Sequence, residues 1–185
     1  MSKSALIVVD VQNDFCEGGA LAAADTASLI EPLHQYVEAA RRKGAVIVYT
    51  QDWHPVEHSS FQKNDGPWPV HCVAGSEGAE LKAPLRASAG DVLIHKGVAI
   101  HGPGYSGFES TELADRLRSL GVERVLLSGI ATEYCVRATA LDALKEGFET
   151  LIVRDLVRAV DPEQTAAVLE ELQNAGAKIM DSAQA

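Results

Sequence analysis

Short apolar runs alternate with longer amphipathic segments along this chain. Six runs rich in branched aliphatic residues are predicted to be β-strands, at 5–9, 45–50, 91–95, 124–128, 150–153 and 178–180. Between them, apolar residues recur at helical spacing over about 28–43, 113–120, 132–146 and 161–175. This alternation is typical of an α/β protein, so we predict a three-layer α-β-α sandwich with a mainly parallel six-stranded sheet.

Residues typical of helix ends mark the limits of these helices. Pro32 falls in the first turn of the first helix, and Gly44 follows its last turn. Asp161 and Pro162 form a start signal for the last helix. No repeat, low-complexity stretch or linker interrupts the pattern, so we expect residues 1–185 to form a single domain.

Composition and charge narrow the function classes. Of the 185 residues, 46% are hydrophobic, and the formal net charge is −10. A chain this acidic is a poor partner for nucleic acids and anionic membranes, which attract basic surfaces. No apolar run reaches the roughly 20 residues that a membrane helix needs, and strand-like sequence begins too early for a signal peptide. We therefore expect a cytoplasmic protein whose three cysteines are free thiols.

Chemically active side chains follow three of the predicted strands. Asp10 follows the first strand and Cys135 lies shortly after the fourth. Asp52 and His54 follow the second strand. The carboxyl ends of parallel strands share one edge of the sheet, where small-molecule sites form. A carboxylate, two metal-ligating side chains and a thiol at one edge suggest a cysteine hydrolase that carries a metal ion.

Cys135 is the strongest candidate nucleophile. We expect it in the first turn of a helix, where partial positive charge lowers the thiol pKa and free N–H groups can hold an oxyanion. The alternative is a small buried hydrophobic residue, which is the commoner fate of a free cysteine. Neither Cys16 nor Cys72 follows a strand at a helix start, so we assign both a structural role.

Asp10 and Lys96 supply groups that such a thiol needs. A carboxylate at the end of a central strand is partly desolvated, which raises its pKa toward that of a useful base. Lys96 ends the third strand at the same edge and can stabilise negative charge on the carboxylate or the thiolate. Taken singly, a capping aspartate and a solvated lysine are the plainer interpretations, but three such groups at strand ends favour catalysis.

Asp52 and His54 are spaced for metal binding. In an extended segment, side chains two residues apart point the same way, so both can reach one ion. His58 and His71 lie in the following loop and can complete the site. Mixed carboxylate and imidazole ligands without thiolates suit zinc, iron or manganese, with coordination positions left open.

Six segments of the sequence form a recognisable series. They are Ile-Val-Val-Asp-Val-Gln-Asn-Asp-Phe (7–15), Thr-Gln-Asp-Trp-His-Pro (50–55), Trp-Pro-Val-His-Cys (68–72), His-Lys-Gly (95–97), Tyr-Ser-Gly-Phe (105–108) and Gly-Ile-Ala-Thr-Glu-Tyr-Cys-Val (129–136). In this order, and across most of the chain, they resemble the nicotinamidase (pyrazinamidase) branch of the isochorismatase-like cysteine hydrolases. The stretch 98–104 departs from the acidic sequence that is usual there, which affects one wall of the pocket.

The resemblance implies the catalytic residues. It implies a triad of Asp10, Lys96 and Cys135. It also implies an oxyanion hole made by the backbone N–H groups of Ala131 and Cys135, next to a cis peptide bond between Ile130 and Ala131.

The resemblance also implies the metal and substrate residues. The implied metal ligands are Asp52, His54 and His71, and His58 is either a further ligand or a support for one. The positions that line the family's pyridine pocket are Phe15, Leu21, Trp68, Tyr105 and Tyr134.

The activity implied by the resemblance is hydrolysis of nicotinamide to nicotinate and ammonia in NAD salvage, extending to pyrazinamide. The cofactor would be one divalent metal ion, zinc before iron or manganese, and a homodimer is the default assembly. A sister amidohydrolase acting on a carbamoyl, ureido or maleamate substrate would keep the triad without needing the metal residues. A binding domain without catalytic activity is the alternative from another class, because fold alone does not imply activity.

Overall fold

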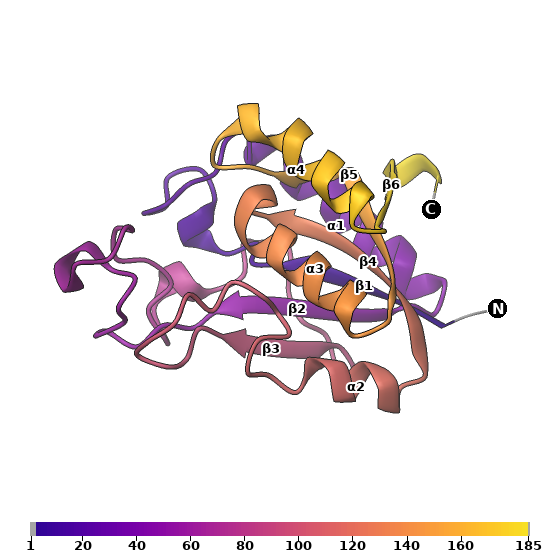
Figure 1. The fold of residues 1–185 in the computed structure, drawn as a ribbon, viewed down its shortest axis with the longest axis horizontal. Helices are drawn as coiled ribbons and strands as arrows, with labels where there is room; N and C mark the ends of the chain where they lie inside the picture. Colours follow the sequence, from indigo (N-terminus) through magenta and orange to yellow (C-terminus); the bar gives the residue numbers. More distant parts are fainter. Residues whose placement is uncertain (1–2, 185) are drawn as a thin grey trace.

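The computed structural model describes residues 3–184, which contain one six-stranded sheet (Figure 1). The strands are β1 (Lys3–Val9), β2 (Val46–Asp52), β3 (Val92–Lys96), β4 (Val122–Ile130), β5 (Glu149–Arg158) and β6 (Lys178–Met180). Their order is β3-β2-β1-β4-β5-β6, and every neighbouring pair is parallel. The predicted six-stranded sheet is confirmed and is parallel throughout.

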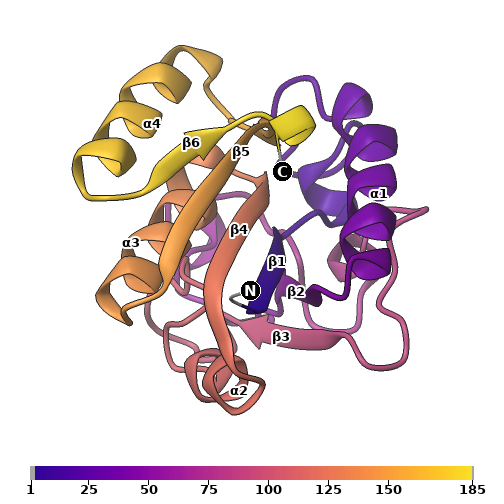
Figure 2. The same ribbon diagram turned by 90° about the vertical axis from the view of Figure 1, so that its right-hand side faces the viewer.

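Four α-helices flank the sheet. They are α1 (Ala27–Arg42), α2 (Leu113–Ser119), α3 (Arg137–Lys145) and α4 (Thr165–Asn174). Figure 2 shows α1 on one face of the sheet and α3 and α4 on the other, which makes the predicted three layers. Among the described residues, no helix is long and apolar enough to cross a membrane.

Side chains alternate between the two faces of the sheet, as a strand requires. In β1, Leu6 and Val8 belong to the same core cluster as Leu33 of α1, whereas Ile7 lies in the other cluster with Leu117 of α2. These side chains are almost completely buried. A central parallel strand covered on both faces therefore reads as the continuous apolar run seen in the sequence.

Several elements differ from the predicted boundaries. β5, for example, continues to Arg158, beyond the predicted 150–153. β2 continues to Asp52, because its last residues pair with the end of β3. After β4 the chain does not enter an α-helix directly: Thr132–Val136 forms a π-helical turn, and α3 starts at Arg137. The Ile130–Ala131 peptide bond before this turn is cis, as the resemblance implied.

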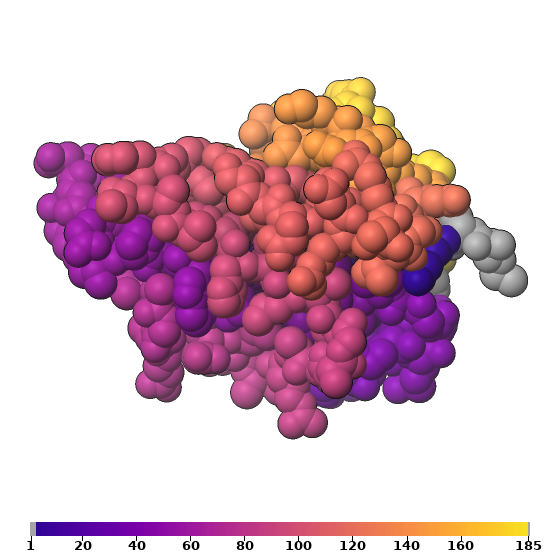
Figure 3. All heavy atoms as spheres, turned by 90° about the horizontal axis from the view of Figure 1, so that it is seen from below, coloured from indigo at the N-terminus to yellow at the C-terminus, as the bar shows by residue number. Residues whose placement is uncertain are grey.

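The segment between β2 and β3 is irregular apart from short 3₁₀ turns at Gln62–Asn64 and Glu77–Ala79. Figure 1 shows it beside the tips of the β2 and β3 arrows, and in Figure 3 its magenta and pink residues make up much of the visible face. Long irregular segments inside a compact domain are usually functional. This one brings its side chains to the edge of the sheet where the strands end.

Candidate active site

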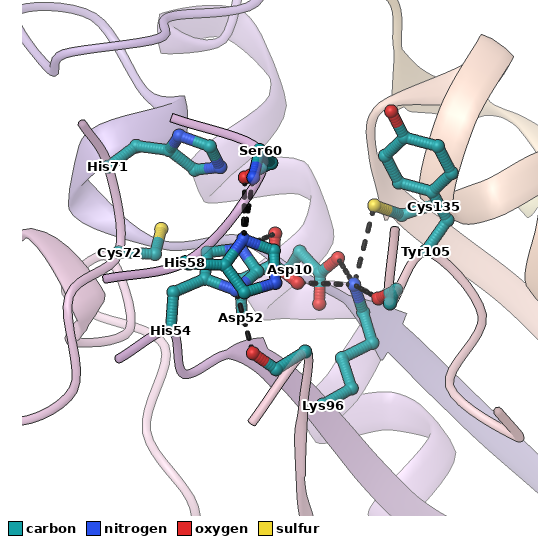
Figure 4. Close-up of polar contacts among 12 residues, drawn as sticks. Asp10, Asp52, His54, His58, Ser60, His71, Cys72, Lys96, Tyr105 and Cys135 are labelled. Atoms are coloured by element: carbon teal, nitrogen blue, oxygen red, sulfur yellow. Dashed lines mark hydrogen bonds and ion pairs between the residues drawn. The ribbon is translucent and has the colours of Figure 1, made fainter. Parts of the chain in front are cut away.

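The ammonium group of Lys96 lies at the centre of a buried polar cluster at the carboxyl ends of the strands (Figure 4). Lys96 is the last residue of β3, and its Nζ is 2.8 Å from Asp10 Oδ2 and 2.6 Å from Asp52 Oδ1. The same Nζ lies 3.4 Å from Cys135 Sγ and donates to the Gly104 carbonyl at 3.0 Å. One cation therefore contacts all three acidic groups that the sequence places at strand ends.

Asp10 directly follows β1 and is completely buried. Its φ of +48° turns the chain out of the strand, and the hydroxyl of Thr50 donates to Asp10 Oδ1 at 2.6 Å. Burial raises the pKa of the Asp10 carboxyl, and although Lys96 lowers it, the nearby charge of Asp52 adds to the increase. The carboxylate is thus a stronger base than an ordinary aspartate, as predicted.

Cys135 lies in the π-helical turn and is 5% exposed. Burial raises the pKa of its thiol well above the ordinary value; Lys96 opposes this effect, while Asp10 and Asp52 add to it. The prediction that the helix start lowers the pKa of Cys135 is therefore wrong. Burial beside two carboxylates outweighs the field of the turn. Cys135 is therefore a thiol at rest. The Asp10 carboxylate, whose own pKa is raised, is near enough to accept its proton.

Asp52, His54 and His71 form a second cluster beside the first. Their ligand atoms all lie within 4.8 Å of one another, and all three side chains are buried. His54 Nε2 is 3.4 Å from Asp52 Oδ2. The three residues that the sequence and the resemblance assign to a metal are therefore brought together, with the mixed carboxylate and imidazole donors that divalent metals accept.

Backbone carbonyls orient both imidazoles of this cluster. Nδ1 of His54 lies 2.8 Å from the Gly97 carbonyl, and Nδ1 of His71 lies 2.7 Å from the Pro69 carbonyl. A carbonyl can only accept, so each Nδ1 carries a proton, and in the neutral ring Nε2 then keeps a lone pair. This support of the far ring nitrogen is typical of metal-bound histidines. The cluster therefore fits a divalent metal ion.

The protonation states of the cluster also suit a cation. Burial opposes ionisation of Asp52, but Lys96 and His54 outweigh it and lower the pKa of the carboxyl. Burial lowers the pKa of His71, which favours the neutral ring. At His54 the Asp52 carboxylate outweighs burial and raises the pKa. When His54 is protonated it carries a second proton on Nε2, and a metal ion would release that proton on binding.

A second group of possible ligands does not qualify as a metal site. Asp10, Asp52 and Cys135 also have ligand atoms within 4.8 Å of one another. The ammonium of Lys96 already lies against both carboxylates. A second cation there would meet the first at close range, so the cluster with two histidines is the better fit for a divalent metal ion.

His58 lies against a ligand of the cluster. Its ring is stacked on that of His54 with 4.1 Å between centroids, and its Nδ1 is 2.7 Å from Ser60 Oγ. Burial lowers the pKa of His58 to about 4, so the ring is neutral. Its Nε2 is buried without a hydrogen-bond partner among the described residues. His58 is outside the three-residue cluster, and its contact with His54 fits the supporting role among the two that the resemblance allowed.

Two residues that the sequence interpretation passed over hold the cluster in place. The side-chain amide of Gln12 accepts from the Asp52 N–H at 2.9 Å and donates to the Asp52 carbonyl at 2.9 Å. Asp14 Oδ2 accepts from the N–H of Cys72, the residue after His71, at 2.7 Å. Both positions lie in the Asp-Val-Gln-Asn-Asp segment after β1, so a run of polar residues following a buried strand was the available signal.

The residues matched to the pyridine pocket are four aromatic residues and Leu21. Trp68 meets Tyr134 edge-on at 5.1 Å between centroids, and Trp68 Nε1 donates to the Tyr105 hydroxyl at 3.2 Å. Phe15 lies 5.5 Å from the His71 ring, between centroids. Leu21 packs with the core on the α1 side of the sheet. The aromatic residues thus flank the two clusters, since Tyr134 precedes Cys135 and Phe15 contacts His71.

The remaining cysteines are buried and free. Burial raises the pKa of Cys16 to about 11 and that of Cys72 well above the ordinary value. Neither contacts Lys96 in the described structure, so both fit the structural role predicted for them.

Comparison with known proteins identifies the family of this fold and site. Residues 4–184 match the family model of the isochorismatase domain. The chain belongs to the isochorismatase family. Within that family it is 40% identical to the nicotinamidase/pyrazinamidase of Mycobacterium tuberculosis, over 96% of this chain and 98% of that protein.

Two solved structures share the architecture. The pyrazinamidase of Pyrococcus horikoshii, in complex with zinc, is 47% identical with a TM-score of 0.93, covering 97% of this chain and 99% of that one. PnC1 from L. infantum, in complex with nicotinate, is 36% identical with a TM-score of 0.87, covering 98% of this chain and 94% of that one. The similarity therefore extends over nearly the whole chain.

Proposed function

We propose that this chain is a nicotinamidase, a metal-dependent cysteine amidohydrolase that converts nicotinamide to nicotinate and ammonia and also accepts pyrazinamide. The observation that supports it most is the position of Lys96 Nζ. This atom joins the base and nucleophile candidates, Asp10 and Cys135, to Asp52 of the metal cluster. Similarity to nicotinamidases and pyrazinamidases over nearly the full length favours the same substrates.

In the first half-reaction the thiol proton of Cys135 passes to Asp10, and the ammonium of Lys96 stabilises the thiolate. Sulfur attacks the carboxamide carbon, and the backbone N–H groups of Ala131 and Cys135 hold the developing oxyanion. Asp10 returns its proton to the leaving nitrogen, and the C–N bond breaks. Ammonia departs and a thioester on Cys135 remains.

In the second half-reaction Asp10, again a carboxylate, takes a proton from water, and the resulting hydroxide attacks the thioester carbonyl. The oxyanion collapses, the C–S bond breaks, and Cys135 recovers the proton from Asp10. The acid is released as nicotinate. The raised pKa values of both groups suit this cycle, because the same proton must move readily in each direction.

Asp52, His54 and His71 would hold the metal ion, which we expect to be zinc, with iron and manganese as the alternatives. The ion would bind the pyridine nitrogen of the substrate as a Lewis acid and so orient the ring. The aromatic residues Trp68 and Tyr134 would pack against that ring. His58, stacked on His54, would keep the imidazole from turning.

Ammonia release measures this proposal directly. Nicotinamide, pyrazinamide and benzamide would be compared as substrates for the enzyme as purified, after treatment with a chelator, and after addition of zinc, iron or manganese. We expect ammonia release to fall when the metal is removed and to recover when the metal is added back. Benzamide should be the poorest substrate, because it has the same shape as nicotinamide but no ring nitrogen.

Other outcomes point to the competing functions. Hydrolysis of maleamate or a ureido acid, unaffected by metal removal, would instead identify a sister amidohydrolase with the same triad. Metal binding without hydrolysis of any of these amides would identify a binding domain. A Cys135→Ala variant that still releases ammonia at the wild-type rate would contradict the covalent scheme.

A further inference from the structure

The π-helical turn at Thr132–Val136 carries several of the groups that the proposed reaction uses. It contains Cys135 and directly follows Ala131, and the backbone N–H groups of these two residues are the proposed oxyanion hole. The N–H groups of Tyr134 and Val136 both donate to the Ala131 carbonyl at 3.1 Å. One carbonyl therefore serves two donors, in place of the regular bonding of an α-helix. Contacts with neighbouring segments then matter for the position of the turn.

Glu133 makes such a contact from within the turn. Its side chain is 8% exposed, and its Oε1 accepts from the backbone N–H of Asp161 at 2.8 Å. Asp161 lies just before the 3₁₀ turn that leads into α4, and its own carboxylate accepts from the Glu163 N–H at 3.1 Å. The bond therefore ties the turn of the candidate nucleophile to the start of the next helical segment.

The stability of the fold does not explain a carboxylate at this position. The second oxygen of Glu133, Oε2, is also buried and has no hydrogen-bond partner among the described residues. Burying a carboxylate removes its hydration, and an oxygen without a partner makes that loss larger. Local features that oppose stability are concentrated at functional sites. Glu133 is two residues from Cys135 and is a buried polar group that the proposed reaction leaves unused.

The other contacts around the turn differ from this one. Thr132 Oγ1 is buried without a partner in the described structure. Arg137, the first residue of α3, donates to Glu171 of α4 from Nε at 2.8 Å and from Nη2 at 2.6 Å. That pair is exposed, and exposed ion pairs contribute little to stability. The buried bond from Glu133 is therefore the contact best placed to fix the turn itself.

We propose that Glu133 is a positioning residue, which holds the turn so that Cys135 and the oxyanion N–H groups face the reacting carbonyl. Its carboxylate acts through the backbone of the turn and does not touch the substrate. The consequence for catalysis rests on the proposed function. A displacement of about 1 Å can cost about 10²-fold in rate. Loss of the bond should therefore lower kcat much more than it changes KM.

Kinetics of the full-length enzyme with nicotinamide test this role. Glu133→Met fills a similar volume but has no acceptor for the Asp161 N–H. We expect kcat and kcat/KM to fall together by about 10–100-fold, because the misplaced groups act in the transition state. KM should stay near the wild-type value, since the metal cluster and Trp68 would still hold the ring. Glu133→Gln keeps an oxygen acceptor and should restore turnover to near the wild-type value.

Asp155→Ala provides the matched control. Asp155 is also a carboxylate that accepts from a backbone N–H, that of Ser182 at 2.8 Å, but it lies outside the turn and outside both clusters. The variant removes the same charge and the same type of hydrogen bond, and it should leave kcat unchanged. Thermal unfolding checks that each variant is folded, and Glu133→Ala replaces Glu133→Met if the latter is not.

Hydrogen exchange separates this inference from the proposed function. Amide exchange in a peptide spanning 131–137 should be faster in Glu133→Met than in the wild type and unchanged in Asp155→Ala, whichever amide the enzyme hydrolyses. That pattern in a protein inactive on nicotinamide and pyrazinamide would contradict the proposed function yet support the positioning of the turn. Three results would overturn the inference: wild-type kcat in Glu133→Met, unchanged exchange in this peptide, or a Glu133→Gln enzyme as slow as Glu133→Met.

Discussion

At the scale of single residues, the candidate active site converges on Lys96 Nζ. An ammonium has three N–H donors, yet Lys96 Nζ has four neighbours, two carboxylates, a carbonyl and a sulfur, within 3.4 Å. Asp10 and Asp52 raise the pKa of Lys96 well above the ordinary value in spite of its complete burial. The lysine therefore stays charged and sets the charge state of both carboxylates.

Replacing Lys96 with Met should affect both stability and turnover. The variant leaves two buried carboxylates without their cation, and breaking such a buried pair costs about 3–5 kcal/mol in the free energy of unfolding. The turnover number for nicotinamide should fall by about 10³-fold, because neither the thiolate nor the base keeps its partner. Urea denaturation and ammonia release measure the two effects. Lys145→Met, at an exposed lysine, is the control, and a Lys96→Met enzyme within tenfold of wild-type turnover would contradict the assigned role.

Gln12 tests whether the backbone of Asp52 must be held for metal binding. Gln12→Met removes the amide that pairs with the N–H and the carbonyl of Asp52. Leaving such buried groups without partners costs about 1–3 kcal/mol each. We expect weaker zinc binding in competition with a chelating dye, by about 10–100-fold.

Gln51 provides the matched control. It is a buried glutamine whose side chain donates to the Ala79 carbonyl at 2.6 Å, an acceptor that Gln12 also uses. Gln51→Met should therefore lower the free energy of unfolding while leaving zinc affinity near the wild-type value. Equal zinc affinities in the two variants would show that the hydrogen bonds between Gln12 and the Asp52 backbone have only a structural role.

At the scale of elements, the loop after β3 positions His54, a proposed metal ligand, through its backbone. Gly97 has a φ of +62°, and a Cβ there would lie 2.4 Å from the His54 ring. Gly97→Ala should displace the imidazole from the carbonyl that orients it and weaken zinc binding by about 10–100-fold. Gly90 also has a positive φ but open space around it, so Gly90→Ala carries only the backbone strain. The same zinc affinity in both variants would mean that Gly97 is needed for its conformation alone.

The sequence predicts where the strands and helices lie better than it predicts the burial and charge around a side chain. The central strands could be located because burial on both faces leaves an uninterrupted apolar run, as in β1, whereas β3 alternates buried and exposed positions. Strand ends place Asp10, Asp52 and Lys96 on one edge. The π-helical turn at Thr132–Val136 has no apolar periodicity to reveal it. The pKa of Cys135 was misjudged because it depends on burial and on charges from three separate strands, which no local pattern records.

At the scale of the whole molecule, the candidate active site gathers at one end of the sheet. The carboxyl ends of the strands carry both the Lys96 cluster and the imidazole cluster. The carboxyl end is built mainly from irregular segments whose side chains converge on Asp52, His54 and His71. Because Asp52 of β2 and His71 of the segment after β2 meet in that cluster, an ion bound there would tie this irregular segment to the end of the sheet.

Metal removal should therefore lower the thermal stability of the entire domain. A ligand that binds only the folded state stabilises it by about 2.7 kcal/mol at 100 times its Kd and by about 4.1 kcal/mol at 1,000 times its Kd. For a domain of this size we expect the Tm to rise by about 5–15 °C when zinc is added to chelator-treated protein. His71→Ala should abolish most of that shift, whereas His34→Ala, on α1 and outside the cluster, should keep it. Calorimetry with each variant measures the shift, and a zinc-dependent Tm that survives His71→Ala would place the ion elsewhere in the molecule.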